Sequence, residues 1–233
     1  MDIDIFSDTI CPWCFIGKRR LERALAERAQ PNLTIRWRTF QLNPNMPAEG
    51  MDRRRYVETK FGGPINAQAV YDQVRAAGES EGIDFAFEAM KRTPNTIASH
   101  RLIRYARLGE TSGGARAAGE ATGAAGANRQ DAVVQALFDA YFLRGEDIGD
   151  LEVLTAAAEN AGLDAAAARA FLEGDAGDEE VRAEDQGARQ AGISGVPCFI
   201  FNGRHALAGA HSPEVLHQLF DLAMQDDAAE AEA

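Results

Sequence analysis

The sequence is short of cysteine, histidine and positive charge. Its 233 residues include three cysteines and four histidines. Three cysteines are too few, and odd in number, for a framework of structural disulfides, and the histidines do not show the close spacing of a structural zinc site. The 36 acidic residues outnumber the 24 basic ones, which gives a net charge of −12. This charge argues against nucleic acid or an anionic membrane as a partner.

Long apolar runs are also missing. No stretch approaches the roughly 20 apolar residues of a membrane-spanning helix, and the opening Met1-Asp2-Ile3-Asp4 differs from the basic and apolar segments of a secretory signal. We therefore expect no membrane partner and a cytoplasmic location, where thiols stay reduced. The composition that remains is that of an ordinary globular protein, with 45% apolar and 26% charged residues.

Two of the three cysteines lie in the segment Cys11-Pro12-Trp13-Cys14. It follows a short apolar run and precedes a helical pattern, a layout that is typical of a thiol–disulfide redox centre. The unpaired N–H groups and the dipole at a helix N-terminus favour the thiolate form of Cys11. Pro12 suits the first helical position. Cys14 lies about one turn on, so it can close a disulfide with Cys11 and release a mixed disulfide.

The periodicity predicts the order β-α-β, then a helical region, then β-β-α. Asn202-Gly203 predicts a hairpin turn between the last two strands. The predicted strands lie at 3–6, 33–40, 198–201 and 204–207, and the predicted helices run from 15 to about 30, through most of 52–192, and onward from 213. This order is that of an α/β thioredoxin-like fold with an inserted α-helical domain.

We divide the chain accordingly. The thioredoxin-like domain is predicted at 1–42 and 186–225, with the α-helical insertion domain at 43–185 between its two parts. The acidic tail at 226–233 is predicted to be disordered. The Gly/Ala-rich stretch at 109–128 is predicted to be a mobile loop or a poor helix.

Several short patches resemble the DsbA-like thiol–disulfide oxidoreductases, and most closely their FrnE-like branch. Together these patches are specific, whereas singly only the first one is. They are Ser7-Asp8-Thr9-Ile10-Cys11-Pro12-Trp13-Cys14, Phe40-Gln41-Leu42-Asn43-Pro44, Thr93-Pro94-Asn95-Thr96, Ala140-Tyr141-Phe142 and Gly195-Val196-Pro197.

The resemblance implies a substrate-binding surface around the cysteines. In thioredoxin-like proteins a cis-proline faces the Cys-x-x-Cys pair, and the same is implied for Pro197; the alternative is an ordinary trans proline that opens a strand. The backbone of Val196 is then expected to pair with an extended peptide substrate. Pro12 and Trp13 complete the expected substrate-contact residues.

The resemblance also implies a role for Asp4 beneath the second cysteine. A carboxylate on a central strand is costly to bury unless it has a partner or a function. Asp4 is therefore a candidate to accept the proton of Cys14 when that thiol attacks a mixed disulfide. A carboxylate at a solvated strand end is the alternative, and both interpretations stay open at this point.

Three further side chains receive more modest predictions. Asp8 is expected nearer the surface, with a turn role or a field effect only. Cys198 departs from the family pattern and is expected to be a buried, inert thiol, with a third reactive or metal-binding thiol as the alternative. His100 is expected on a helix surface with a partner of its own, the alternative being a position at the border of the cleft.

We predict a thiol–disulfide oxidoreductase that exchanges electrons between the Cys11/Cys14 dithiol and protein or small-molecule disulfides and thiols. Glutathione or a thioredoxin-type protein is the expected reductant. We predict no dissociable cofactor and no metal, and the sequence gives no basis for an oligomeric state.

Two alternatives remain open. One is a glutathione-dependent isomerase or transferase of the kappa-class type, such as 2-hydroxychromene-2-carboxylate isomerase. That family usually has Ser at the position of Cys11 and lacks the second cysteine, so Cys14 argues against it. The other is a non-catalytic protein with a zinc or thiol binding site.

Overall fold

A computed structural model describes residues 1–30, 32–111 and 129–231 of the chain. Its main sheet has four strands in the order β2-β1-β5-β6. The central strand β1 (Asp2–Ser7) pairs in parallel with β2 (Thr34–Thr39) and antiparallel with β5 (Cys198–Phe201). Strand β6 (His205–Ala208) pairs antiparallel with β5. The predicted order of strands and helices, and with it the α/β thioredoxin-like fold class, is confirmed.

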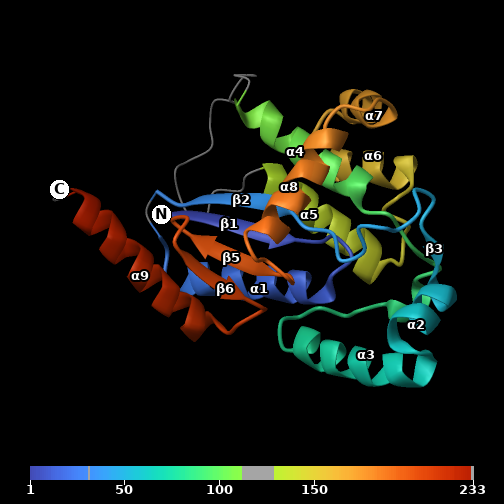
Figure 1. Cartoon of the computed structure of the whole chain (residues 1–233), viewed down its shortest axis with the longest axis horizontal. Helices are drawn as coiled ribbons and strands as arrows, with labels where there is room; N and C mark the ends of the chain where they lie inside the picture. The colour runs from blue at the N-terminus through green and yellow to red at the C-terminus, as the bar shows by residue number, and fades with distance from the viewer. Residues whose placement is uncertain (31, 112–128, 232–233) are drawn as a thin grey trace.

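Helices cover both faces of this sheet. Helix α1 (Pro12–Glu27) lies below it in Figure 1 with α9 (Pro213–Ala231) beside it, and several inserted helices lie above it. Gly17 of α1 comes close to Phe199, which is the register partner of Ile5 on β1. Alternation along β1 therefore turns Ile3 and Ile5 toward α1, where both are fully buried.

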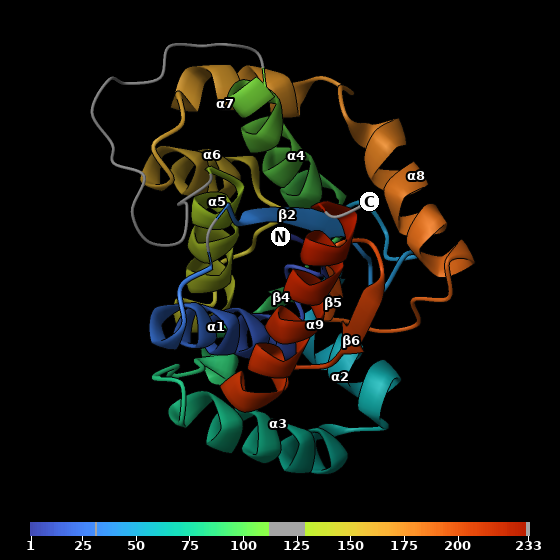
Figure 2. The ribbon, with the colours of Figure 1, turned by 90° about the vertical axis from the view of Figure 1, so that its left-hand side faces the viewer.

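Helices make up most of the described part of the inserted region. Figure 2 shows α3 on the α1 side of the molecule and α4 and α7 on the opposite side. A two-residue strand pair, β3 (Met51–Asp52) with β4 (Arg92–Thr93), is a small addition to the predicted elements. The helices are α2 (Arg53–Phe61), α3 (Pro64–Glu79), α4 (Ile97–Thr111), α5 (Arg129–Phe138), α6 (Leu151–Asn160), α7 (Ala165–Glu173) and α8 (Asp178–Gln190), with short turns η1 (Phe87–Ala89) and η2 (Asp139–Leu143).

An aromatic cluster joins the insertion to the sheet domain. The ring of Phe15, on α1, stacks on Phe138 at 5.1 Å between centroids and on Phe142 at 6.1 Å. All three side chains are almost fully buried in one apolar core. Because aromatic rings bury large apolar areas, the insertion is held to α1 by the same interior that holds α1 to the sheet.

Local sequence signals fix several boundaries. Asp164 caps α7 by accepting a hydrogen bond from the backbone N–H of Ala167, as its position before the helix predicts. Asn202 and Gly203 both have positive φ, which is the requirement of the tight hairpin turn predicted between β5 and β6. Most of the Gly/Ala-rich stretch predicted at 109–128 lies outside the described residues, and 109–111 form the end of α4.

The prediction of a disordered tail from residue 226 is wrong for residues 226–231, because α9 continues to Ala231. Alanine and glutamate, which make up most of this stretch, are strong helix formers. The Asp226 carboxylate is also 2.8 Å from Nε2 of His205 on β6, so it has a partner at the sheet edge. Residues 232–233 lie outside the described part. None of the helices in that part is long and apolar enough to cross a membrane.

Tyr141 gives the core a measurable pH dependence. It is fully buried, and burial raises its pKa from 10.0 to about 12, although the charge of Arg53 and a hydrogen bond with Thr93 oppose that rise. Since the folded-state pKa lies above the unfolded one, the stabilisation is complete below pH 10 and is lost as the pH rises toward 12.

We expect Tyr141→Phe to lose about 1 kcal/mol at neutral pH, because it removes a buried hydroxyl that is hydrogen-bonded. The stability of the wild type relative to the variant should fall by about 1.4 kcal/mol between pH 9 and pH 11, enough to cancel its advantage, because over this range the unfolded tyrosine ionises and the buried one does not. Urea unfolding of both proteins under reducing conditions measures this. A difference that stays constant over this pH range contradicts the assignment.

Candidate active site

Cys11 lies at the N-terminus of α1, as predicted. Strand β1 ends at Ser7, and a tight turn follows in which the N–H of Cys11 donates to the carbonyl oxygen of Asp8 at 3.0 Å. Cys11 is the N-cap residue of α1 with extended backbone angles, and Pro12 occupies the first helical position. The sulfur of Cys11 therefore lies at the positive end of the α1 dipole.

The two thiols of this motif are both free, but their surroundings differ. The Cys11 Sγ donates to the carbonyl oxygen of Val196 over 3.6 Å. Burial raises the pKa of Cys14 well above its usual value of 9.0, and the neighbouring Cys11 adds to this, whereas the Ser7 side chain and the Asp8 backbone act in the opposite direction. Cys14 is therefore held as a thiol at neutral pH. Cys11, in contrast, lies at the N-terminus of the helix.

The residues predicted to contact substrate border Cys11. The Val196–Pro197 peptide bond is cis. Pro197 is buried against α1, with its Cγ only 3.0 Å from the place where a Cβ on Gly17 would lie. Pro12, Trp13 and Val196 are half-buried, and the last two pack at the edge of the apolar core. Cys11 itself is 3% exposed, so access to its sulfur is narrow.

Asp4 does not lie beneath Cys14. Its Oδ1 accepts from Nε of Arg38 at 2.7 Å, and Arg38 also pairs with Glu184 of α8 at 3.2 Å. Alternation along β1 places Asp4 on the face opposite Ile3 and Ile5, whereas α1 packs on the face that these isoleucines share. The prediction of Asp4 as the proton acceptor of Cys14 is therefore not supported, and Ser7 is the β1 residue that contacts Cys14.

Asp8 is completely buried, so the prediction of a position near the surface is wrong. Its Oδ2 accepts the backbone N–H of Leu42 at 2.7 Å. Its Oδ1 lies 3.5 Å from Nε2 of His100. The tight turn before Cys11 brings this carboxylate inward, where the segment after β2 and the start of α4 close over it.

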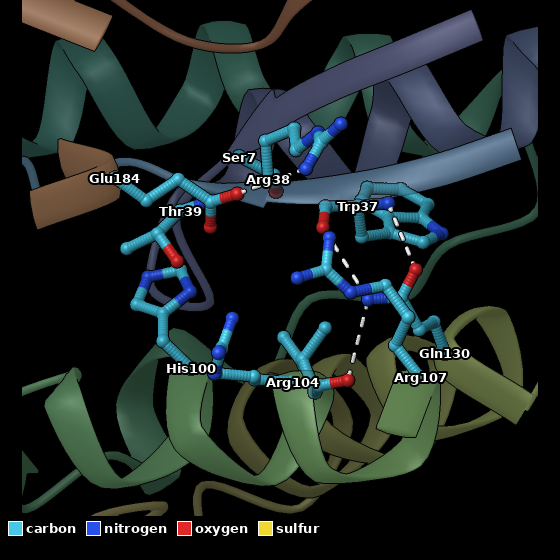
Figure 3. A pocket seen from close by; sticks show the side chains of 10 residues that line it. Ser7, Trp37, Arg38, Thr39, His100, Arg104, Arg107, Gln130 and Glu184 are labelled. Atoms are coloured by element: carbon cyan, nitrogen blue, oxygen red, sulfur yellow. Dashed lines mark hydrogen bonds and ion pairs between the residues drawn. The ribbon is translucent and has the colours of Figure 1, made fainter. Parts of the chain in front are cut away.

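His100 is also buried, at 3% exposure, so the prediction of a helix-surface histidine is wrong as well. It lies in the first turns of α4, and its neighbour Ser99 is 2.8 Å from the hydroxyl of Thr9. Two contacts thus tie α4 to the turn before the cysteines. Figure 3 shows the His100 side chain pointing from α4 toward Thr39 at the end of β2, at one side of a small cavity.

Three of the patches that carry the family resemblance meet at this turn. Leu42 binds the carboxylate of Asp8, and the side-chain amide of Gln41 donates to Thr96 at 3.3 Å. The patches at 7–14, 40–44 and 93–96 therefore form one structural unit behind the cysteines. No periodicity in the sequence indicates this meeting, because it depends on how β2 and α4 pack against β1.

Cys198 is 5% exposed, and burial raises its pKa. Its neighbour Phe199 faces α1, so Cys198 points to the other face of the sheet. This environment fits the predicted buried thiol. Among the described residues, no cluster of three or more His, Cys, Asp or Glu side chains has the arrangement of a metal site.

Chemically, the arrangement is suited to thiol–disulfide exchange. One sulfur lies at a helix N-terminus and beside a carbonyl group that an extended substrate chain can approach. The second sulfur lies behind it, protonated and close enough to attack the first. Such a pair can form a mixed disulfide and then resolve it.

Comparisons with known proteins agree with this geometry. The chain matches the family described as DSBA-like thioredoxin domain over residues 2–221. It is similar to the probable DsbA oxidoreductase SCO1869 from Streptomyces coelicolor, with 30% identity, a TM-score of 0.79 and coverage of 97% of this chain and 90% of that one.

Two more distant structures share the fold. The cytosolic disulfide reductase DsbM from Pseudomonas aeruginosa is 16% identical with a TM-score of 0.60, and the match covers 100% of both chains. A 2-hydroxychromene-2-carboxylate isomerase is 20% identical with a TM-score of 0.64, and the match covers 100% of this chain and 98% of that one. At such identities the likeness concerns the fold alone. The family match over nearly the whole chain, together with the likeness at 30% identity, identifies the protein as a member of the DsbA-like thioredoxin-fold family.

Proposed function

We propose that the protein is a thiol–disulfide oxidoreductase in which Cys11 attacks and Cys14 resolves. The observation that carries this proposal is the asymmetry of the pair: Cys11 caps α1 beside the Val196 carbonyl, whereas burial keeps Cys14 protonated behind it. The thiolate is the attacking form of a cysteine. Of the two cysteines, Cys11 is the one at the N-terminus of α1.

The exchange then runs in two steps. The Cys11 thiolate attacks one sulfur of a substrate disulfide, a mixed disulfide forms, and the other substrate sulfur leaves as a thiolate that takes a proton from solvent. Cys14 next loses its proton and attacks the Cys11 sulfur. The mixed disulfide breaks, the second substrate thiolate leaves, and two electrons have passed from the dithiol to the substrate.

Substrate is expected to approach over Pro12, Trp13, Val196 and Pro197. These residues border Cys11, which is only 3% exposed, so the substrate must present its disulfide on a slim or extended segment. We expect the Val196 backbone to pair with such a segment as an added strand. A glutathione disulfide or an unfolded peptide meets this requirement.

Glutathione is the proposed reductant, with a thioredoxin-type protein as the alternative, and the proposed location is the cytoplasm. The structural relative DsbM is described as a cytosolic disulfide reductase and has been solved with GSH, which supports both choices. The FrnE-like branch and the boundaries of the insertion domain stay predictions. The isomerase reading is less well supported, because the second thiol at Cys14 has no part in it.

Cysteine substitutions test the roles of the two sulfurs. Cys11→Ser should lower insulin disulfide reduction to the background rate, because the attacking sulfur is gone. Cys14→Ser should trap a mixed disulfide between Cys11 and glutathione, visible by intact mass spectrometry. Cys198→Ser, which removes a buried thiol on the other sheet face, should keep most of the activity. A Cys11→Ser protein that reduces insulin at the normal rate would end the proposal.

Alkylation tests the protonation asymmetry. Because burial raises the pKa of Cys14 well above 9.0, its thiolate fraction stays small until the pH exceeds that value. Iodoacetamide at pH 7 should therefore modify Cys11 first, and peptide mapping should find Cys14 modified only at strongly alkaline pH or after unfolding. Equal modification of the two cysteines at pH 7 in the folded protein contradicts the assignment.

Gly17 provides a test of the Pro197 position. A Cβ at Gly17 would lie 3.0 Å from Pro197 Cγ and 3.3 Å from Phe199, so Gly17→Ala has to displace Pro197 by a few tenths of an ångström. We expect turnover to fall by roughly 3- to 10-fold, since a displacement of about 1 Å can cost about 100-fold.

The matched control is Gly187→Ala on α8, where the new Cβ would have no described atom within 4 Å apart from its chain neighbours and the nearby backbone of its own helix. Both changes replace a helical glycine by alanine and gain the same helix propensity. The control should keep full activity. If both variants, or neither of them, lose activity, the close packing of α1 on Pro197 does not set the geometry of the site.

A further inference from the structure

Asp8 and His100 form a buried pair of opposite potential charge directly behind the dithiol. Their side chains are 0% and 3% exposed, and Asp8 Oδ1 is 3.5 Å from His100 Nε2. Within the described residues neither of these two atoms has a hydrogen-bond partner. Buried polar atoms are nearly always paired, so such a pair next to a reactive centre calls for a functional explanation.

The proposed exchange creates a need for a proton acceptor at this place, and the present inference rests on that proposed function. Cys14 is held as a thiol and has to lose its proton when it attacks the mixed disulfide. Its polar contacts are the Ser7 side chain, the Asp8 backbone and Cys11. A hydroxyl and an amide can pass on or donate a proton, but neither keeps an additional one at neutral pH. The Asp4 carboxylate forms an ion pair with Arg38 on the other face of the sheet, so it does not meet this need.

Ser7 connects Cys14 to the buried pair. Its side chain contacts Cys14, and Ser7 also lines the small cavity that His100 lines. Figure 3 shows Ser7 and His100 on the border of this cavity. The Thr39 side chain points from β2 toward His100 on α4. The cavity leaves about 10 Å³ for the centre of a water molecule, which is close to the smallest space that holds one. Ser7 therefore both contacts Cys14 and borders the cavity that His100 lines.

We propose that His100, supported by Asp8, accepts the proton that Cys14 loses during resolution. The S–H bond of Cys14 breaks and its electron pair forms the bond to Cys11 Sγ. The bond between Cys11 and the substrate sulfur breaks, the substrate leaves as a thiolate, and the proton of Cys14 passes by way of Ser7 to His100. The imidazolium then forms next to the Asp8 carboxylate, which compensates its charge. When a reductant opens the Cys11–Cys14 disulfide, Cys14 leaves as a thiolate and takes the same proton back.

The helices and strands that pack around Asp8 and His100 contribute further charged groups, some positive and some negative. Arg104 is itself paired with Glu180 at 3.2 Å, and Arg38 is paired with Asp4 and Glu184. The groups that border the cavity or interact with Asp8 are Arg38 of β2, Arg104 and Arg107 of α4, Glu184 of α8, Tyr56 of α2, and the two active-site cysteines. A comparison of variants is therefore more informative than the wild-type pH profile alone.

The test is a single-turnover reaction of the reduced protein with glutathione disulfide. Acid quenching and intact mass spectrometry follow the mixed disulfide on Cys11 and its conversion to the internal disulfide. His100→Gln should leave formation of the mixed disulfide within about twofold and slow its conversion by roughly 100-fold, the usual scale of a general base.

The pH profile separates proton transfer from a structural role. In the wild type the conversion rate should rise with pH and level off once His100 is neutral. In His100→Gln it should rise about tenfold per pH unit over the same range, because hydroxide replaces the imidazole. A loss by the same factor at every pH, or conversion at the wild-type rate, overturns the proposal.

Two further variants keep the test decisive if His100→Gln folds poorly. Asp8→Asn retains an oxygen for the N–H of Leu42 but removes the charge, so the pH at which conversion levels off should fall; an unchanged profile overturns the proposal. The control His205→Gln alters a partly buried histidine on β6, 2.8 Å from Asp226 and away from the dithiol, and it should behave as the wild type. A wild type that forms no mixed disulfide refutes the proposed function itself, and this inference with it.

Discussion

The tight turn that joins β1 to α1 is the constraint on which the site depends. It places one sulfur at the helix N-terminus, where backbone N–H groups stabilise negative charge, and the other one turn deeper, where burial disfavours it. Two chemically identical side chains thus acquire different roles from their positions along one helix. The same turn buries the carboxylate of Asp8, which binds the segment after β2. Reactivity and local folding are therefore set by the same few residues.

The inserted helices are part of the site rather than an attachment to it. Helix α4 brings His100 to Asp8, and Ser99 to Thr9. Phe138 and Phe142 hold α1 by stacking on Phe15. A thioredoxin-like sheet with α1 alone would leave the turn at Asp8 open to water, and a solvated carboxylate there would have little influence on the thiols. The insertion supplies the low-dielectric surroundings that give these polar groups their effect.

The features that sequence reasoning predicted are those encoded locally. The Cys-x-x-Cys pair with Pro12 marks the helix start, Asn202-Gly203 marks the hairpin, and apolar alternation marks the strands. The features it missed depend on tertiary contacts. Alternation along β1 shows that Asp4 and Ile3 face opposite sides, but which side α1 covers is decided by packing against Phe199. Likewise, nothing within α4 distinguishes a histidine that faces solvent from one that faces Asp8.

Burial of charge explains why the acidic residue near the thiols is Asp8 and not Asp4. A carboxylate on the apolar face of β1 would lose its hydration with only side chains of the core around it. At the end of the strand, Asp8 meets the free N–H of Leu42 and the imidazole of His100 instead. Asp8 therefore has polar partners because it lies just beyond the end of β1, where the backbone is no longer paired within the sheet. In this fold that is the point at which β1, β2, α1 and α4 converge.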